Sequence, residues 1–218
     1  MTPLEVVFHL KTPLALGHPW LHLDSLLAHV LLREELGERY YALPTKVADR
    51  EAGRAVEARL PLKRWRDVPV ASVSIFEPPS AQLQLFSFFK RGDFPFPRGR
   101  VDRARGFFKD YYLRAAYAPV QRVRFYCTGE QEEVARLCRM ISALGKERNI
   151  GFGFVKRVEV REVEEEWGLV REGVAMRPIP IDYLRQWEDV SWLAYKPPYW
   201  SKQNVKLCCV PFTRVELA

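Results

Sequence analysis

The sequence lacks the marks of membrane, secreted and zinc-binding proteins. No apolar run approaches the roughly 20 residues that cross a bilayer, and residues 1–5 lack the basic, apolar start of a signal peptide. The four cysteines form no CxxC pair, and the adjacent Cys208 and Cys209 are poorly placed to ligate one zinc ion. We therefore expect a cytoplasmic protein with reduced thiols that binds neither a metal nor a membrane.

Motifs of common enzymes are also absent. The sequence contains no DxD, HExxH or GxSxG motif, and its glycine-rich stretch fits neither a Walker loop nor GxGxxG. An acidic run follows the last predicted strand of the core, at Glu162, Glu164, Glu165 and Glu166. Such runs usually lie in solvent. We therefore expect no cofactor, and the sequence gives only weak support for an enzyme.

The chain has an excess of positive charge. Its 34 Lys and Arg residues outnumber 27 Asp and Glu, which gives a net charge of +7 and a pI near 9.3. Hydrophobic residues make up 48% of the chain, enough for a folded core. The surface should attract polyanions, nucleic acid first and an anionic membrane second, although many basic proteins bind neither.

Apolar periodicity predicts an α+β fold. The predicted strands are residues 2–10, 70–76, 82–89, 121–127 and 154–163. The predicted helices are residues 25–35, capped by Asp24, and a second helix that opens at Gly129 and Glu130. The second and third strands either pair as a hairpin or form one interrupted arm.

This order of strand, helix, strands, helix, strand is that of a ferredoxin-like βαββαβ core with an antiparallel sheet. We assign residues 1–163 to the core, including a basic insertion at residues 90–119. Residues 164–218 are assigned to a C-terminal extension packed on the core, because they are too few for an independent domain.

A glycine-rich loop follows the second predicted helix. Glycine tolerates positive φ and lets a ligand approach the backbone, whose amides bind phosphate oxygens, while nearby cations add charge. The candidate RNA-binding residues in this loop are Gly145, Lys146, Arg148, Asn149, Gly151 and Gly153. A glycine-capped helix followed by a flexible loop explains the same residues equally well.

Arginine alternates with phenylalanine, glycine and proline between residues 90 and 109. Guanidinium groups pair with phosphate and aromatic faces stack on bases, a combination that suits single-stranded RNA. The candidate RNA-binding residues here are Lys90, Arg91, Arg98, Arg100, Arg103, Arg105 and Lys109. Poor helical propensity predicts a loop or thumb that RNA orders, with a solvated charge run as the alternative.

Two histidines, His22 and His29, are the candidates for catalysis. Acid–base cleavage at an RNA 2′-hydroxyl needs a histidine with a second base, tyrosine or lysine close by. Tyr40, Tyr41 and Lys46 are the candidate partners. A histidine beside an apolar run is more often structural, so catalysis is the alternative interpretation.

Together these features resemble the RAMP superfamily of CRISPR-associated proteins. The resemblance rests first on residues 144–153, LGKERNIGFG, a glycine-rich basic loop that joins a helix to a core strand. Two further stretches, WLHLDSLLA at 20–28 and EGVAMRPIP at 172–180, resemble the Cas-five-type subunit of the type IV branch.

The resemblance implies a non-catalytic subunit that caps an effector complex, grips the 5′ handle of the CRISPR RNA and abuts the first backbone subunit. The loop residues that match are Lys146, Arg148, Gly151 and Gly153, and the basic insertion lies where family members carry a thumb. A position near the end of the guide also implies contact with target DNA, for which the candidates are Arg39, Lys46, Arg50 and Arg54. The alternatives are a metal-independent CRISPR RNA-processing endoribonuclease that uses His22 or His29, and a scaffold protein that binds no RNA.

Overall fold

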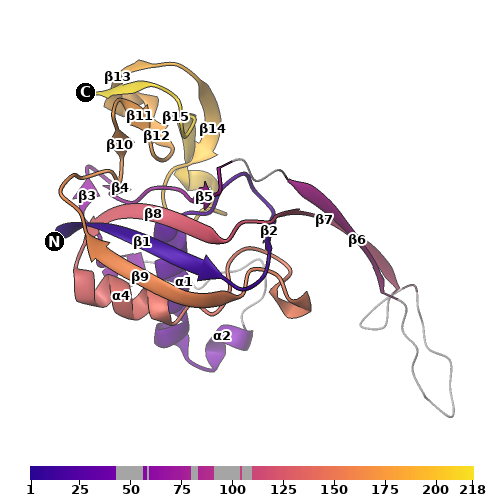
Figure 1. Cartoon of the computed structure of the whole chain (residues 1–218). Helices are drawn as coiled ribbons and strands as arrows, with labels where there is room; N and C mark the ends of the chain where they lie inside the picture. The colour runs from indigo at the N-terminus through magenta and orange to yellow at the C-terminus, as the bar shows by residue number, and fades with distance from the viewer. Residues whose placement is uncertain (43–55, 58, 80–82, 91–103, 105–109) are drawn as a thin grey trace, which may run out of the picture.

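The computed structural model describes residues 1–42, 56–57, 59–79, 83–90, 104 and 110–218. Figure 1 shows a sheet backed by helices, a two-stranded arm that projects from it, and a strand-rich C-terminal lobe (residues 164–218). The strands of each sheet are antiparallel, so the chain has the mixed α+β character that its periodicity predicts. None of the helices in the described residues is long and apolar enough to span a membrane.

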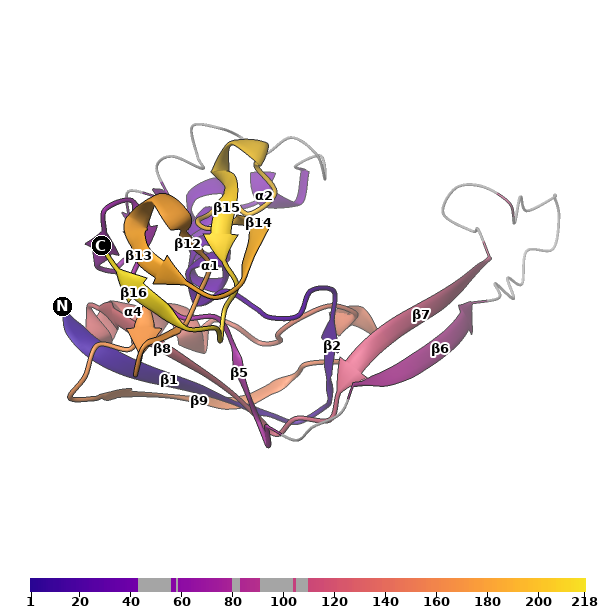
Figure 2. The ribbon, with the colours of Figure 1, turned by 90° about the horizontal axis from the view of Figure 1, so that it is seen from above.

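Strand β1 (Thr2–Leu10) lies at the centre of the main sheet. It pairs with β8 (Arg122–Gly129) on one side and β9 (Val155–Glu162) on the other, and β5 (Ile75–Glu77) extends the sheet beyond β8. The resulting order is β5-β8-β1-β9. Helix α1 (Leu23–Leu36) falls between β1 and β5 in the chain, and α4 (Gln131–Arg139) falls between β8 and β9. Figure 2 shows both helices on the same side of the sheet.

The main core lies between this sheet and its helices. Alternate residues of β1, Leu4, Val6 and Phe8, are fully buried, as the two-residue period of a strand requires. Phe8 meets Phe125 of β8 edge-on, with 5.9 Å between ring centroids. The helices contribute Leu23, Leu27, Val30, Leu31, Val134, Leu137 and Cys138. Full burial of a large apolar side chain stabilises the fold by about 1.5–3 kcal/mol, so these apolar faces hold the layer together.

Helix α1 begins differently from the prediction. His22, not Asp24, occupies the N-cap position, and its side chain makes no capping hydrogen bond. Asp24 lies inside the first turn and is fully buried, where its carboxylate accepts hydrogen bonds from Arg177 and Tyr199. The predicted cap was wrong because a distant arginine and tyrosine compete for the carboxylate.

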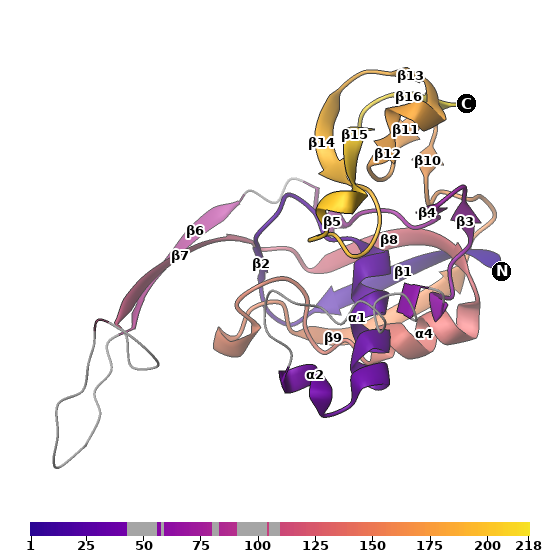
Figure 3. The ribbon, with the colours of Figure 1, turned by 180° about the vertical axis from the view of Figure 1, so that it is seen from behind.

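The predicted strands 70–76 and 82–89 do not pair with each other. Of the first, Ile75 and Phe76 join the main sheet in β5, and Ala71 makes an isolated antiparallel bridge to Cys127 of β8. The second, β6 (Gln84–Lys90), pairs with β7 (Tyr111–Ala118), which in turn pairs with β2 (Leu14–Leu16). Strand β7 lies in the segment predicted to be an irregular insertion. The pair β6–β7, which we call the arm, extends away from the sheet (Figures 1 and 3).

The C-terminal lobe is built from short strands. They are β10 (Val170–Arg171), β11 (Val174–Ala175), β12 (Ile179–Pro180), β13 (Leu184–Trp187), β14 (Val190–Ala194), β15 (Val205–Cys209) and β16 (Val215–Leu217). Strands β12, β15 and β14 form one sheet, while β13 pairs with β16. The lobe has its own apolar cluster, which includes Ile179, Cys208 and Cys209 and is completed by Val68 and Val70. Strands β3 (Arg64–Trp65) and β4 (Val68–Pro69) thus belong to the packing of this lobe.

Candidate nucleic-acid interface

Residues 144–153, which we call the glycine loop, are fixed at both ends to the segment that contains β2. The amide of Lys146 donates to the carbonyl of Ala15 at 2.9 Å, and the amide of Gly153 donates to the carbonyl of Pro13 at 2.8 Å. The amide of Leu144 closes the loop on itself through the carbonyl of Gly153, at 2.9 Å. The loop is therefore held in a defined shape.

The three glycines of the loop have different roles. All adopt positive φ, at +74° for Gly145, +105° for Gly151 and +69° for Gly153. A Cβ on Gly145 would collide with the carbonyl of Ala15, and one on Gly153 with the carbonyl of Leu144. Only Gly151 faces open space. Two of the glycines predicted to admit a ligand are thus required by the packing of the chain itself, and Gly151 alone leaves the backbone accessible.

The polar side chains of the glycine loop are exposed. Lys146, Arg148 and Asn149 are exposed, with the Lys146 side chain lying over Gly17, and Arg148 opens a turn of 3₁₀ helix at Arg148–Ile150. In the described part of the chain, none of these three side chains makes a hydrogen bond or an ion pair. Glu147 lies between the two cations, so the loop carries one net positive charge. Unpaired donors on a fixed backbone suit a phosphate oxygen.

The glycine loop contacts the base of the arm through Phe152. Its ring lies 5.4 Å from that of Phe86 on β6 and 5.7 Å from that of Tyr117 on β7, measured between centroids. The glycine loop is therefore packed against the root of the arm, whose strands flank the basic segment predicted to bind RNA. Lys90 ends β6, whereas the predicted RNA-binding residues Arg91, Arg98, Arg100, Arg103, Arg105 and Lys109 lie outside the described residues.

His29 lies on α1 close to this surface. Its Nδ1 is 3.0 Å from the Tyr40 hydroxyl, which belongs to the short helix α2 (Arg39–Ala42). Burial lowers the pKa of His29, and the positive charges of Arg148 and Arg33 lower it further. Arg39 is exposed at the start of α2, while the other predicted DNA-binding residues, Lys46, Arg50 and Arg54, lie outside the described part.

His22 has different contacts. Its Nε2 accepts a hydrogen bond from the indole Nε1 of Trp20 at 3.2 Å, and its ring stacks on Tyr199 with 3.8 Å between centroids. Burial lowers its pKa to about 4, and the nearby Asp24 carboxylate offsets this only partly. His22 is thus a neutral acceptor at neutral pH. The structure places the two predicted catalytic histidines in separate networks.

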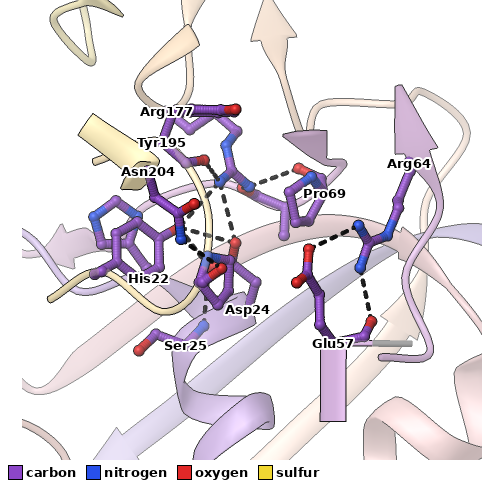
Figure 4. Close-up of polar contacts among 12 residues, drawn as sticks. His22, Asp24, Ser25, Glu57, Arg64, Pro69, Arg177, Tyr195 and Asn204 are labelled. Carbon is purple, nitrogen blue, oxygen red and sulfur yellow. Dashed lines mark hydrogen bonds and ion pairs between the residues drawn. The ribbon is translucent and has the colours of Figure 1, made fainter. Parts of the chain in front are cut away.

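A buried ion pair connects the two stretches that resemble a type IV subunit. Arg177 and Asp24 are both fully buried, and Arg177 Nη2 donates to Asp24 Oδ2 at 3.1 Å. Tyr199 donates to the same carboxylate at 2.8 Å and accepts from Arg177 at 3.0 Å. The guanidinium also donates to the carbonyls of Pro69 (2.6 Å), Ala71 (2.8 Å) and Tyr195 (2.6 Å). Figure 4 shows how these groups converge on Arg177.

This ion pair was not predicted from the sequence. A lone arginine in the apolar stretch from Val174 to Ile179 was the available signal, because an isolated charge in such a stretch needs a buried partner. The pair fixes the C-terminal lobe to the start of α1. It therefore positions the lobe relative to the core.

Comparison with protein families gives one decisive match. The family described as CRISPR type IV associated protein Csf3 matches residues 94–211, more than half of the chain. The chain belongs to this family. The matched region spans β7, the glycine loop and Arg177. The protein is therefore a type IV CRISPR-associated protein.

No curated protein matches the sequence, whereas 15 chains of solved structures are similar in structure. One of them comes from a structure titled "Cryo-EM structure of the Type III-B Cmr-beta bound to cognate target RNA". It shares 11% identity over 74% of the Csf3-family chain, with a TM-score of 0.40. The present chain spans 61% of the length of that chain.

Proposed function

We propose that this protein is a guide-RNA-binding subunit of a type IV CRISPR ribonucleoprotein and carries out no catalysis. In this proposal it grips the 5′ handle of the CRISPR RNA, contacts the adjacent backbone subunit and resembles the Cas-five-type cap. The observation that carries the proposal is the contact of Phe152 with the arm, which joins the exposed cations of the glycine loop to the arm in one surface. Membership of the type IV family supports a place in such a complex.

The same proposal interprets the main layer as a ferredoxin-like fold. The support is the sheet order β5-β8-β1-β9 together with the placement of α1 and α4 between strands. In such a layer the loop after the second helix leads straight into an edge strand, here β9. The glycine loop is thereby held at one end of the sheet, next to the root of the arm.

The surface offers two kinds of contact with single-stranded RNA. Arg148, Lys146 and the open backbone at Gly151 suit phosphate oxygens. Phe89 and Tyr112 are cross-strand partners on the arm, with 59% and 60% of their surfaces exposed, and suit stacking on bases. A surface of this composition binds the RNA backbone tightly and discriminates only weakly between RNA sequences.

A salt titration of repeat-RNA binding tests the proposal. Arg148→Ala removes one phosphate contact, so the affinity should fall several-fold and the slope of log K against log salt should decrease by about 1. Arg157→Ala is the matched control, because Arg157 is an exposed arginine on β9 that pairs with Glu159 at 2.9 Å. An Arg148→Ala variant that folds normally and binds with unchanged affinity and slope would refute the role of the loop.

One observation favours a second candidate, the metal-independent endoribonuclease. His29 lies 3.0 Å from the Tyr40 hydroxyl, has a lowered pKa and is therefore neutral and able to accept a proton at neutral pH. Cleavage of repeat RNA in EDTA that is lost in His29→Ala would establish this activity. Tight binding without cleavage supports the non-catalytic proposal, and absence of RNA binding at moderate salt leaves a scaffold role.

Contact with target DNA also belongs to the proposal. Arg39 is the candidate that the described residues contain, exposed at the start of α2. Its neighbour Tyr40 contacts His29, and the positive charge of Arg148 is near enough to His29 to lower the pKa of that histidine. The proposed guide surface and this arginine are therefore close in space, as a site for DNA next to the guide requires.

A further inference from the structure

A second cluster of cations and aromatic rings lies on the C-terminal lobe and on the turn between β3 and β4. We call it the turn patch. Its members are Trp65, Arg66, Asp67, Tyr183, Tyr195, Lys196 and Lys206. Figures 1 and 3 place β3 and β4 at the opposite end of the molecule from the arm. The turn patch is therefore remote from the surface proposed to hold the guide.

Two of its cations rest on aromatic rings. The guanidinium of Arg66 lies 4.6 Å from the ring centroid of Tyr183 and 5.0 Å from that of Trp65. The ammonium of Lys206 lies 5.4 Å from Tyr183 and 5.5 Å from Tyr195. Within the described ranges neither cation has a carboxylate partner. The ring of Tyr183 thus holds both cations, whose charges the described residues leave unneutralised.

A single carboxylate orders the rest of the turn patch. Asp67 accepts hydrogen bonds from Tyr183 at 2.9 Å, Tyr195 at 2.6 Å and Lys196 at 2.8 Å. Partial burial opposes its charge, but these three donors outweigh that effect and lower its pKa to about 2. Asp67 therefore stays ionised and fixes both tyrosine rings on which the cations rest. Three cations against one carboxylate leave the patch positively charged.

The backbone of Arg66 is an independent sign that this side chain serves a purpose. Trp65 and Val68 are paired, so Arg66 and Asp67 form a two-residue hairpin loop. Arg66 has φ of +55° at the first loop position, where glycine is strongly favoured. A long side chain in that conformation is strained, and strain of this kind concentrates at functional sites.

We propose that the turn patch is a second nucleic-acid contact, which binds phosphate groups of a single-stranded polynucleotide through Arg66 and Lys206. A guanidinium stacked on a ring keeps its edge donors free for phosphate, and prior immobilisation reduces the entropy lost on binding. Because the patch is remote from the arm, it engages a different strand from the one held by the glycine loop. This inference rests on the proposed function only in taking the protein to be part of a nucleoprotein complex.

The test uses the full chain saturated with unlabelled repeat RNA. A second, fluorescently labelled strand is then titrated by anisotropy, with separate arms for single-stranded RNA, single-stranded DNA and duplex DNA. Arg66→Gly combined with Lys206→Ala should weaken binding of a single strand about tenfold or more and lower the salt slope by about 2. Arg185→Ala, an exposed arginine of the same lobe 3.4 Å from Glu216, controls for the loss of charge.

Arg66→Gly alone separates function from folding. Glycine accepts the positive φ without strain, so the melting temperature should stay the same or rise while affinity falls. Unchanged second-strand binding and salt slope in the double variant would overturn the inference. Binding of duplex DNA but of neither single-stranded ligand would also overturn it. The effect of Arg148→Ala on guide-RNA binding tests the proposed function in a separate measurement. Failure of that proposal and failure of the turn-patch inference can therefore be told apart.

Discussion

Replacing Arg177 by methionine should destabilise the protein far more than removal of an exposed arginine such as Arg157 or Arg185. Methionine matches the length of the arginine stem but carries no charge. Asp24 would remain fully buried with only Tyr199 and the amide of Ser25 as donors. Three backbone carbonyls would also lose a donor, although that of Pro69 still accepts from the amide of Ala71.

The magnitude follows from that geometry. Breaking a buried ion pair by removing one partner costs about 3–5 kcal/mol, because the other charge stays buried without compensation. We expect a loss of about 4 kcal/mol against a total stability of about 5–15 kcal/mol for a typical domain. Urea unfolding followed by tryptophan fluorescence measures it, with six tryptophans as reporters.

A double variant separates the charge from the packing. Asp24→Leu together with Arg177→Met leaves no buried charge at this site, so it should recover part of the loss and be less destabilised than the sum of its single variants. Arg177→Lys keeps the charge but loses the planar set of guanidinium donors, so its stability should lie between those of the wild type and Arg177→Met. A cost below about 1 kcal/mol for Arg177→Met, or strict additivity in the double variant, would refute the account of the ion pair.

Three further predictions follow from the structure. Gly153→Ala should destabilise the fold by about 2 kcal/mol or more, because its Cβ meets a backbone carbonyl. Gly151→Ala should cost only about 1 kcal/mol, because its Cβ meets nothing and only the positive φ is unfavourable. Equal losses of stability for the two variants in thermal unfolding would contradict the packing account. Folding lowers the pKa of His22 from 6.5 to about 4, so on acidification the unfolded chain binds this proton first. Acidification from pH 6.5 to 4 should therefore lower the free energy of unfolding by about 3 kcal/mol. In urea titrations, His22→Phe should remove that part of the pH dependence. Phe152→Ala should loosen the arm and weaken RNA binding with little change in salt slope, since it removes no charge; a slope change equal to that of Arg148→Ala would argue for a different cause.

The layers of the core could be predicted from the sequence because their signals are local. Apolar core residues recur at every second position in each strand: Leu4, Val6 and Phe8 in β1, Val123, Phe125 and Cys127 in β8, and Val158 and Val160 in β9. The apolar residues of α1 and α4 repeat at helical spacing. Each of these patterns lies within one element, so no knowledge of its partner is needed.

The features that escaped prediction depend on partners distant in the chain. Asp24 looked like a helix cap because its local context fits one, but its partner Arg177 lies 153 residues away. Strand β7 was hidden because it lies inside the predicted insertion, and residues 91–110 separate it from its partner β6 in the chain. Nor does a glycine pattern reveal what a Cβ would meet, so the separate roles of Gly151 and Gly153 needed the folded chain.

Ultraviolet crosslinking of the protein to repeat RNA, followed by mass spectrometry of the crosslinked peptides, tests the central claim most directly. The proposed surface predicts crosslinks in β7, at the exposed Tyr112, and in the glycine loop, at Phe152. Arg148→Ala should reduce both together, since the loop and the arm form one surface. Crosslinks absent from both elements, in a complex that binds RNA tightly, would contradict the claim.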